Sequence, residues 1–253
     1  MKYLKKSLVI LLLCSSLSLF GEIFYSKDYM PTSLKPNNTL FGVDIHYTLI
    51  NRDSWKMAKI MVSEFGVTAL YHFLRPSVRS YFYSDEMENL EWQDKIKTLA
   101  ERFPELKPLI SAAFHIDNSR TPIEGMPELI KWLHDKGYEL DVFSNIHPNT
   151  YYGWHSSEVD ASGKPAQSTP GLKDLMPEIF SNFASAQVGA KKPEPQAFAN
   201  FVSQFNKDRL KKIIFIDDSK KNIKAAVENG IDIGILFESP DQLKEDLKSL
   251  GIK

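Results

Sequence analysis

Polar residues follow apolar runs at four places in this sequence, and their types suit phosphoryl chemistry. In chain order they are Asp44, Ser144, Lys192 and the pair Asp217-Asp218. A lone aspartate, serine or lysine at such a position is most often a turn former or a solvated side chain. Two adjacent carboxylates are less ordinary, because they repel each other unless a cation or hydrogen-bond donors compensate. Together the set offers a nucleophile, a hydroxyl donor, a positive charge and oxygen ligands for a divalent cation.

These groups can act together only if strands bring them to one edge of a sheet. The strand-like runs are Leu40–Ile45, Tyr138–Phe143, Lys212–Ile216 and Ile231–Phe237, with a shorter one near Ala186–Val188. Helical patterns alternate with them, at Pro127–Lys136, Leu172–Ala184, Asn222–Asn229 and Asp241–Leu250. This alternation predicts an α/β fold, a Rossmann-like parallel sheet flanked by helices. Ligands of such sheets bind beyond the carboxyl ends of the strands.

The sequence around these residues resembles the haloacid dehalogenase superfamily of hydrolases. Val43–Leu49 resembles its DxDxT-type first motif, and Phe143–Asn145 resembles the second. Val188–Pro195 has the G-x-x-K-P-x-P form of the third motif. Phe215–Ser219, with Asn222 and Ala225, resembles the fourth. The order and spacing of the four motifs agree with the family from Leu40 to about Phe237.

The resemblance implies a catalytic aspartate and a magnesium site. Asp44 would be the nucleophile and would form an aspartyl-phosphate. Mg²⁺ would be held by Asp44, Asp218 and the backbone carbonyl of His46, and Asp217 would orient these ligands from the second shell of the metal site. The implied fold carries an inserted helical cap domain.

The same resemblance implies a phosphate-binding set on the second and third motifs. The Ser144 hydroxyl would donate a hydrogen bond to a phosphate oxygen, and Asn145 beside it is a further candidate phosphate ligand. Lys192 would contribute a positive charge to the phosphate and to Asp44. The implied substrate is a small phosphorylated molecule.

His46 departs from the family pattern, in which the second residue after the nucleophile is usually aspartate. That aspartate protonates the leaving oxygen and then activates water. Imidazole can do both, because its pKa lies near neutrality. Beside Mg²⁺, however, like charge disfavours the protonated ring. Substrates with good leaving groups, such as acyl or aryl phosphates, would be affected least.

Three functions therefore stay open. The first is a Mg²⁺-dependent phosphatase with histidine at the acid/base position. The second is a dehalogenase-type hydrolase, which would need a halide-binding arginine such as Arg75, Arg79 or Arg102; the intact Asp217-Asp218 pair argues against it. The third is an exported binding protein that has kept the fold with little or no activity.

The spacing of the motifs predicts the domain organisation. Asp44 and Ser144 are 100 positions apart, and the aromatic-rich segment between them predicts a helical cap at 52–118. Such a cap excludes water and selects the substrate. The expected α/β core is 39–51 and 119–253. Residues 19–38, which contain two prolines and an Asn-Asn pair, are expected to be a linker.

Composition limits the partners. The chain has 253 residues, 43% of them hydrophobic and 25% charged, and a formal net charge of −1. A chain this long can bury a sizeable core, and its near-neutral charge gives no electrostatic case for nucleic-acid binding. The one cysteine, Cys14, excludes an intrachain disulfide framework.

The first 18 residues resemble a secretory signal peptide. Three lysines in Met1–Lys6 precede the apolar run Leu8–Cys14 and a small-residue stretch ending at Ser18. Cleavage after Ser18 would export the protein to the periplasm or the medium. The alternative is a lipoprotein anchored through Cys14, although Leu13 stands where lipoproteins usually have a small residue. Contact with a membrane is expected only through this N-terminal segment.

Overall fold

The computed structural model describes residues 21–52, 92–107, 120–145, 176–179, 183–184 and 190–253, with shorter stretches between 59 and 90. The chain divides into two compact units. One contains residues 1–49, 123–145 and 178–253, and the other contains 50–122 and 146–177. The expected cap, 52–118, falls within the second unit. Residues 146–177, which were expected in the α/β core, also group with the second unit.

A six-stranded sheet with the order β1-β8-β7-β2-β5-β6 forms the centre of the first unit. All pairings in it are parallel except that of β1 with β8. The parallel pattern confirms the α/β class predicted from the alternation of strands and helices. The strands are β1 Ile23–Tyr25, β2 Thr39–Val43, β5 Glu139–Phe143, β6 Phe183–Ala184, β7 Lys212–Asp217 and β8 Ile233–Leu236.

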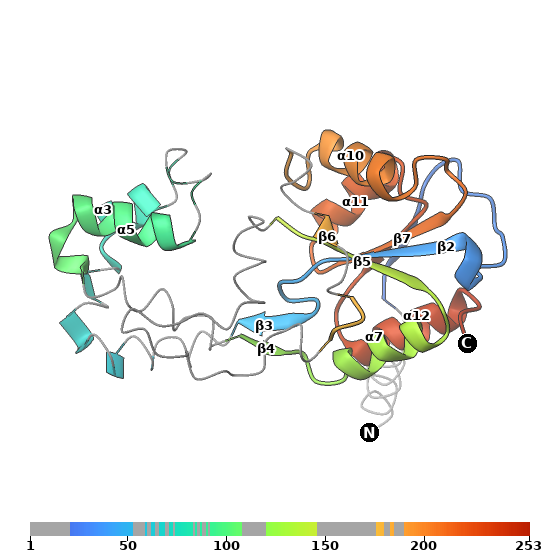
Figure 1. Ribbon diagram of the computed structural model, residues 1–253, viewed down its shortest axis with the longest axis horizontal. Helices are drawn as coiled ribbons and strands as arrows, with labels where there is room; N and C mark the ends of the chain where they lie inside the picture. The colour runs from blue at the N-terminus through green and yellow to red at the C-terminus, as the bar shows by residue number, and fades with distance from the viewer. Residues whose placement is uncertain are drawn as a thin grey trace, which may run out of the picture. The chain divides into compact units, whose positions relative to one another are not determined.

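Helices cover both faces of this sheet (Figure 1). The pair α10 (Pro195–Phe205) and α11 (Lys220–Glu228) lies on one face, and the pair α7 (Met126–Asp135) and α12 (Pro240–Ser249) lies on the other. The hydroxyls of Ser219 and Ser239 accept backbone N–H bonds in the first turns of α11 and α12 and so fix where these helices begin. The first unit is therefore a three-layer α/β/α sandwich.

Aromatic side chains fill the core between the sheet and α10. Phe143 of β5 stacks on Phe201 with ring centroids 4.6 Å apart, and it meets Phe198 edge-on at 5.6 Å. Phe215 of β7 completes the cluster, and all four side chains are fully buried. Phe143 lies at the carboxyl end of its strand and Phe215 two residues before the end of β7, so the aromatic core directly supports the edge where the polar residues begin.

The expected linker is instead packed within the first unit from residue 21 onward. β1 pairs antiparallel with β8, the Leu34 side chain is buried, and the Tyr138 hydroxyl donates to the Leu34 carbonyl at 3.1 Å. Glu22 also forms an ion pair with Lys220 of α11. A strand of three residues is too short to show an alternating pattern, so the linker prediction is wrong for this part of the chain.

Two further elements differ from the predictions. Helix α10 begins at the second proline of the third motif, where no helix was predicted. Its buried positions, at Ala197, Phe198, Phe201 and Val202, have ordinary helical spacing. The helix predicted over Leu172–Ala184 is wrong at its end, because Phe183–Ala184 forms strand β6 beside β5.

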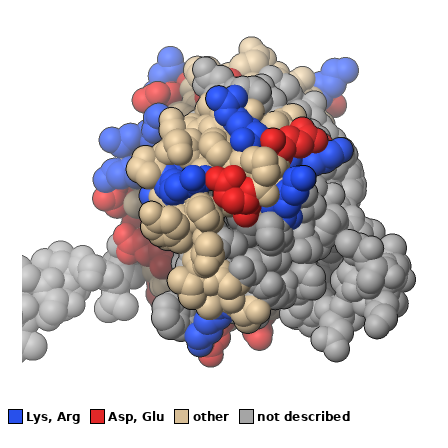
Figure 2. All heavy atoms as spheres, turned by 90° about the vertical axis from the view of Figure 1, so that its left-hand side faces the viewer, with Lys and Arg blue, Asp and Glu red and all other residues tan. Residues whose placement is uncertain are grey.

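The second unit contains a two-stranded antiparallel ribbon and short helices. Strand β3 (Ile50–Arg52) pairs with β4 (Arg120–Pro122), and α3 (Pro76–Phe82) contacts α5 (Trp92–Arg102). The Arg102 guanidinium lies 4.3 Å from the centroid of the Tyr81 ring. In the described part of the surface in Figure 2, basic and acidic side chains are interspersed.

Several predictions concern residues outside the described set. These are the signal peptide with Cys14 and the short strand expected near Ala186–Val188. Among the described residues, no helix is both long enough and apolar enough to span a membrane.

Candidate active site

Three strand ends align at the carboxyl edge of the sheet. Val43 of β2 is in register with Val142 of β5 on one side and with Ile216 of β7 on the other. The Asp44 N–H donates to the Ile216 carbonyl at 2.9 Å, which holds Asp44 against β7. Parallel pairing in this register brings Asp44 and Asp217 together, although 173 positions separate them in the chain.

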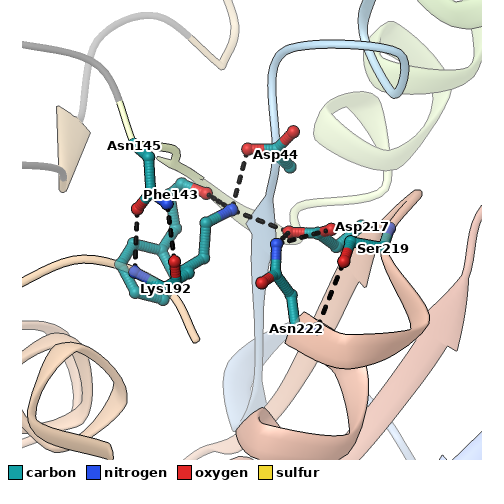
Figure 3. Close-up of polar contacts among 7 residues, drawn as sticks. All are labelled: Asp44, Phe143, Asn145, Lys192, Asp217, Ser219 and Asn222. Carbon is teal, nitrogen blue, oxygen red and sulfur yellow. Dashed lines mark hydrogen bonds and ion pairs between the residues drawn. The ribbon is translucent and has the colours of Figure 1, made fainter. Parts of the chain in front are cut away.

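Lys192 lies between the two aspartates (Figure 3). Its Nζ donates to Asp44 Oδ1 at 2.7 Å, to Asp217 Oδ2 at 2.7 Å and to the Phe143 carbonyl at 2.6 Å. The ammonium also lies about 5 Å from the Phe143 and Phe215 ring centroids, at 5.1 and 4.9 Å. Burial alone would favour the neutral amine, but the Asp44 and Asp217 carboxylates outweigh it and raise the pKa of Lys192.

Asp217 is buried, and both of its carboxylate oxygens accept hydrogen bonds. Asp217 Oδ1 accepts the Ser219 N–H at 2.8 Å, and the Asn222 amide donates to both carboxylate oxygens at 3.0 Å. Burial raises the pKa of Asp217, and the positive charge of Lys192 counters only part of this rise. Because its oxygens already accept these bonds, Asp217 is suited to orienting Lys192 and the start of α11.

Asp218 completes a cluster of three carboxylates. Ligand oxygens from Asp44, Asp217 and Asp218 all lie within 4.8 Å of one another. Asp218 is an exposed residue, yet partial burial of its carboxyl and repulsion from Asp217 and Asp44 raise its pKa to about 6. A hard divalent cation would relieve this repulsion, and carboxylate oxygens are the ligands that Mg²⁺ prefers. The donor set therefore fits the magnesium ion that the sequence implied, with the buried Asp44 and the exposed Asp218 as the candidate ligands.

The two residues expected to bind phosphate on the second motif have different surroundings. Ser144 is buried directly after β5, one residue beyond the carbonyl that accepts from Lys192. Asn145 bonds to the backbone of Lys192: its Oδ1 accepts the Lys192 N–H at 2.8 Å, and its Nδ2 donates to the Lys192 carbonyl at 2.7 Å.

His46 lies in the turn that follows β2 and is half-buried. The turn is closed by a hydrogen bond from the Leu49 N–H to the Ile45 carbonyl at 2.9 Å. Tyr47 has a left-handed backbone conformation, with φ of 59°, which few non-glycine residues adopt. The side chains of Ile45 and Leu49 are buried, so this turn is anchored on both sides of His46.

Three contributions to the site were not found in the sequence. The carbonyl of Phe143 is a third acceptor for Lys192, the Phe143 and Phe215 rings border its ammonium, and Asn222 orients Asp217. Asn222 belonged to the fourth motif without an assigned partner. Its position three residues after the helix-capping Ser219 places it in the first turn of α11, close to Asp217, and this spacing was the available signal.

Comparison with known proteins bears on the family and the fold of the chain. The family model of haloacid dehalogenase-like hydrolases matches residues 48–230. The matched range begins after Asp44 and His46, so the first motif is supported by the strand register and not by the match.

The chain is similar to two known proteins, over different shares of its length. The chain is 32% identical over 130 residues to the chloroplast protein flavin mononucleotide hydrolase 1 of Arabidopsis thaliana, and the match covers 51% of this chain and 46% of that protein. It thus spans about half the length of this curated relative. A structure from Porphyromonas gingivalis, described as a predicted HAD-like family hydrolase, superposes with a TM-score of 0.51 at 16% identity, over 88% of this chain and all of that one. This likeness concerns the fold.

The family match covers well over half of the chain, and the fold agrees with it. The chain belongs to the haloacid dehalogenase-like hydrolase family.

Proposed function

We propose that this hydrolase is a Mg²⁺-dependent phosphatase that acts on a small phosphate ester through an aspartyl-phosphate at Asp44. The observation that carries the proposal is the shared position of Asp44, Lys192 and Asp218 at one sheet edge. One Asp44 oxygen accepts from Lys192, and the other points away from the lysine (Figure 3). That second oxygen is the one available for attack on phosphorus.

The reaction has two displacements. An Asp44 oxygen forms a bond to phosphorus while the bond from phosphorus to the alcohol oxygen breaks, and the leaving alcohol takes up a proton. Water then attacks the phosphorus of the aspartyl-phosphate, which releases inorganic phosphate and restores Asp44. Lys192 holds the nucleophile in place, and Mg²⁺, when bound at Asp44 and Asp218, would offset the negative charge of the phosphoryl group.

His46 is assigned the proton transfers. A protonated imidazole would supply the proton to the leaving alcohol, and the neutral ring would then accept a proton from the attacking water. Ser144 is assigned to a phosphate oxygen through its hydroxyl, because it lies at the end of β5 next to the Lys192 contacts.

The relative's name suggests where to begin with substrates. That protein is called a flavin mononucleotide hydrolase. Flavin mononucleotide is therefore the first phosphate ester to test, beside smaller alkyl, aryl and acyl phosphates.

A panel of phosphate esters, assayed with and without Mg²⁺, tests the proposal. Phosphate release should require Mg²⁺, and Asp44→Asn should reduce it to background on every ester, because an amide is a poor nucleophile. Turnover that persists in Asp44→Asn, or that ignores Mg²⁺ removal by chelation, would contradict the aspartyl-phosphate route.

The histidine at position 46 favours one second candidate, an exported binding protein with little or no activity. The panel separates the two when His46→Asp is included. For a phosphatase that uses His46, His46→Asp should keep or raise activity with a lower pH optimum, and His46→Ala should lose about 10²–10⁴-fold. If the parent is inactive on every ester and His46→Asp is active, the binding-protein candidate replaces the phosphatase. Halide release from a haloacid would instead identify a dehalogenase.

A further inference from the structure

Asn145 and Lys192 are joined through the lysine backbone. The two hydrogen bonds, at 2.7 and 2.8 Å, use the carbonyl oxygen and one N–H of the Asn145 amide (Figure 3). They connect the turn after β5 to the loop before α10, across 47 positions of the sequence. The Asn145 side chain thus spans the distance between the second and third motifs.

This connection bears on an ammonium group whose three N–H groups all have acceptors. Lys192 Nζ reaches three acceptors within 2.7 Å in a site where its side chain is 1% exposed. A buried ammonium in such a site is stabilised only while the geometry to its carboxylate partners is kept. The backbone of Lys192 is the base from which its side chain reaches these partners, so the position of this backbone decides where the ammonium lies.

We propose that Asn145 is a positioning residue that acts through Lys192, and not primarily a phosphate ligand as its sequence position suggested. The proposal rests on the proposed phosphatase function where it concerns turnover. The Asn145 amide keeps one further N–H, so direct phosphate binding is the competing outcome that an experiment must separate. Removing a residue that orients a ligand of an active site typically costs about 10–100-fold in activity.

The chain contains a matched control. Asn206, after α10, makes the same pair of bonds to the backbone of Lys211: its Oδ1 accepts the Lys211 N–H at 3.0 Å, and its Nδ2 donates to the Lys211 carbonyl at 2.6 Å. The Lys211 side chain forms an ion pair with Glu139, at the start of β5 and so at the other end of that strand from Asn145. Asn206→Ala therefore removes an equivalent pair of hydrogen bonds and leaves the residues of the candidate active site unchanged.

A double-mutant cycle tests the route of action. Asn145→Ala should lower kcat about 10–100-fold with KM changed less, and Asn206→Ala should leave kcat within about twofold of the parent. In a Lys192→Met background, Asn145→Ala should cause little further loss, because the group it positions is gone. If the two losses multiply, or if Asn145→Ala changes only KM, Asn145 binds phosphate directly and the proposal is wrong.

A measurement without turnover keeps this test separate from the proposed function. Nitrogen-detected NMR of the full chain should show a slowly exchanging lysine ammonium signal that disappears in Lys192→Met. This signal should shift or broaden in Asn145→Ala and stay unchanged in Asn206→Ala, with thermal unfolding showing that both variants fold. An unchanged signal in folded Asn145→Ala overturns the proposal. If no ester is hydrolysed by the parent, the phosphatase function fails while this result still decides the role of Asn145.

Discussion

Asn145 and Asn206 hold the backbones of two lysines with the same pair of hydrogen bonds, yet the two ammonium groups end in different surroundings. Lys192 is buried between Asp44 and Asp217, whereas Lys211 is paired with a single glutamate, and the side chains of that pair are 29% and 38% exposed. Water screens the second pair and not the first. The same pair of backbone hydrogen bonds therefore has unequal consequences, which depend on how deeply the lysine charge is buried.

The two lysines differ in how much depends on the exact position of the ammonium group. At Lys211, one negative charge meets one positive charge beside solvent, and little depends on the exact placement. At Lys192, a single positive charge compensates two buried carboxylates, and the pKa of Asp218 beside them is raised to about 6. The cluster at the sheet edge is thus short of positive charge, which is the condition that favours binding of a divalent cation.

The largest expected effect comes from removing the ammonium of each lysine. Lys192→Met should abolish most of the proposed phosphatase activity and lower the free energy of unfolding by about 3–5 kcal/mol near pH 7.5, because two carboxylates stay buried without charge compensation. Lys211→Met should cost about 0–1 kcal/mol, since its partner is solvated. Urea unfolding of both variants measures the difference.

The pH dependence of that experiment has a defined sign. The pKa of Asp217 is raised by burial even with the lysine present. In Lys192→Met, stability lost at pH 7.5 should therefore return in part as the pH falls toward 5, where the carboxyls take up protons. Equal stability losses in the two lysine variants at pH 7.5 would contradict the comparison.

The next largest effect is expected from Mg²⁺, which should stabilise the fold by binding to the carboxylates at the sheet edge. At a concentration 100 times its dissociation constant, Mg²⁺ should stabilise the parent by about 2.7 kcal/mol. Binding should weaken below pH 6, because the Asp218 carboxyl has a pKa of about 6 without the ion and must lose its proton to bind. Thermal unfolding with and without Mg²⁺, at pH 5.5 and 7.5, measures both points.

The matched variants for the magnesium experiment are Asp218→Asn and Asn206→Ala. Asp218→Asn should lose the Mg²⁺ response, because an amide is a weaker ligand than a carboxylate. Asn206→Ala should keep it. If Asp218→Asn is still stabilised by Mg²⁺, the metal binds at another place.

The smallest effect is expected at another buried carboxylate, Asp246 of α12. Neutral donors hold it: the Gly21 N–H at 3.2 Å and the Gln242 amide. Burial raises the pKa of Asp246, because it disfavours the ionised carboxylate in the folded state. Its contribution to stability is present at low pH and declines as pH rises through the raised pKa.

Asp246→Asn should accordingly change the free energy of unfolding at pH 7.5 by no more than about 1 kcal/mol, and it should flatten the dependence on pH. Urea unfolding between pH 4 and 7.5 measures this. A loss as large as that of Lys192→Met would show that burial alone, and not missing charge compensation, determines the cost.

Much of the fold was accessible from sequence, for reasons visible in particular elements. β2, β5, β7 and β8 are apolar runs, and α7, α11 and α12 are bounded by Pro, Ser or Gly. β1 was missed because three residues show no period, and α10 because its first turn coincides with a proline-containing motif. Such local signals identify elements and do not show which distant segments pair.

The same limit applies to the site. The strand-end rule singled out Asp44, Lys192, Asp217 and Asp218, which the structure brings together. The partner of Asn145 could not be predicted, because the direction of a side-chain amide depends on a loop that lies 47 positions away. Sequence motifs identify the residue types, whereas the tertiary structure determines which of them contact one another.

We expect the N-terminal strand to limit the association of this protein with other copies of itself. β8 would be the outer strand of the parallel sheet if β1 did not pair with it. An uncovered strand offers a row of unpaired N–H and carbonyl groups that recruit further chains and lead to aggregation. Gly21, which precedes β1, donates its N–H to Asp246 of α12, and a Cβ there would overlap the side chains of Gln242 and Asp246. A recombinant chain that begins after Tyr25 would lack this strand. We expect such a chain to lose solubility before it loses activity.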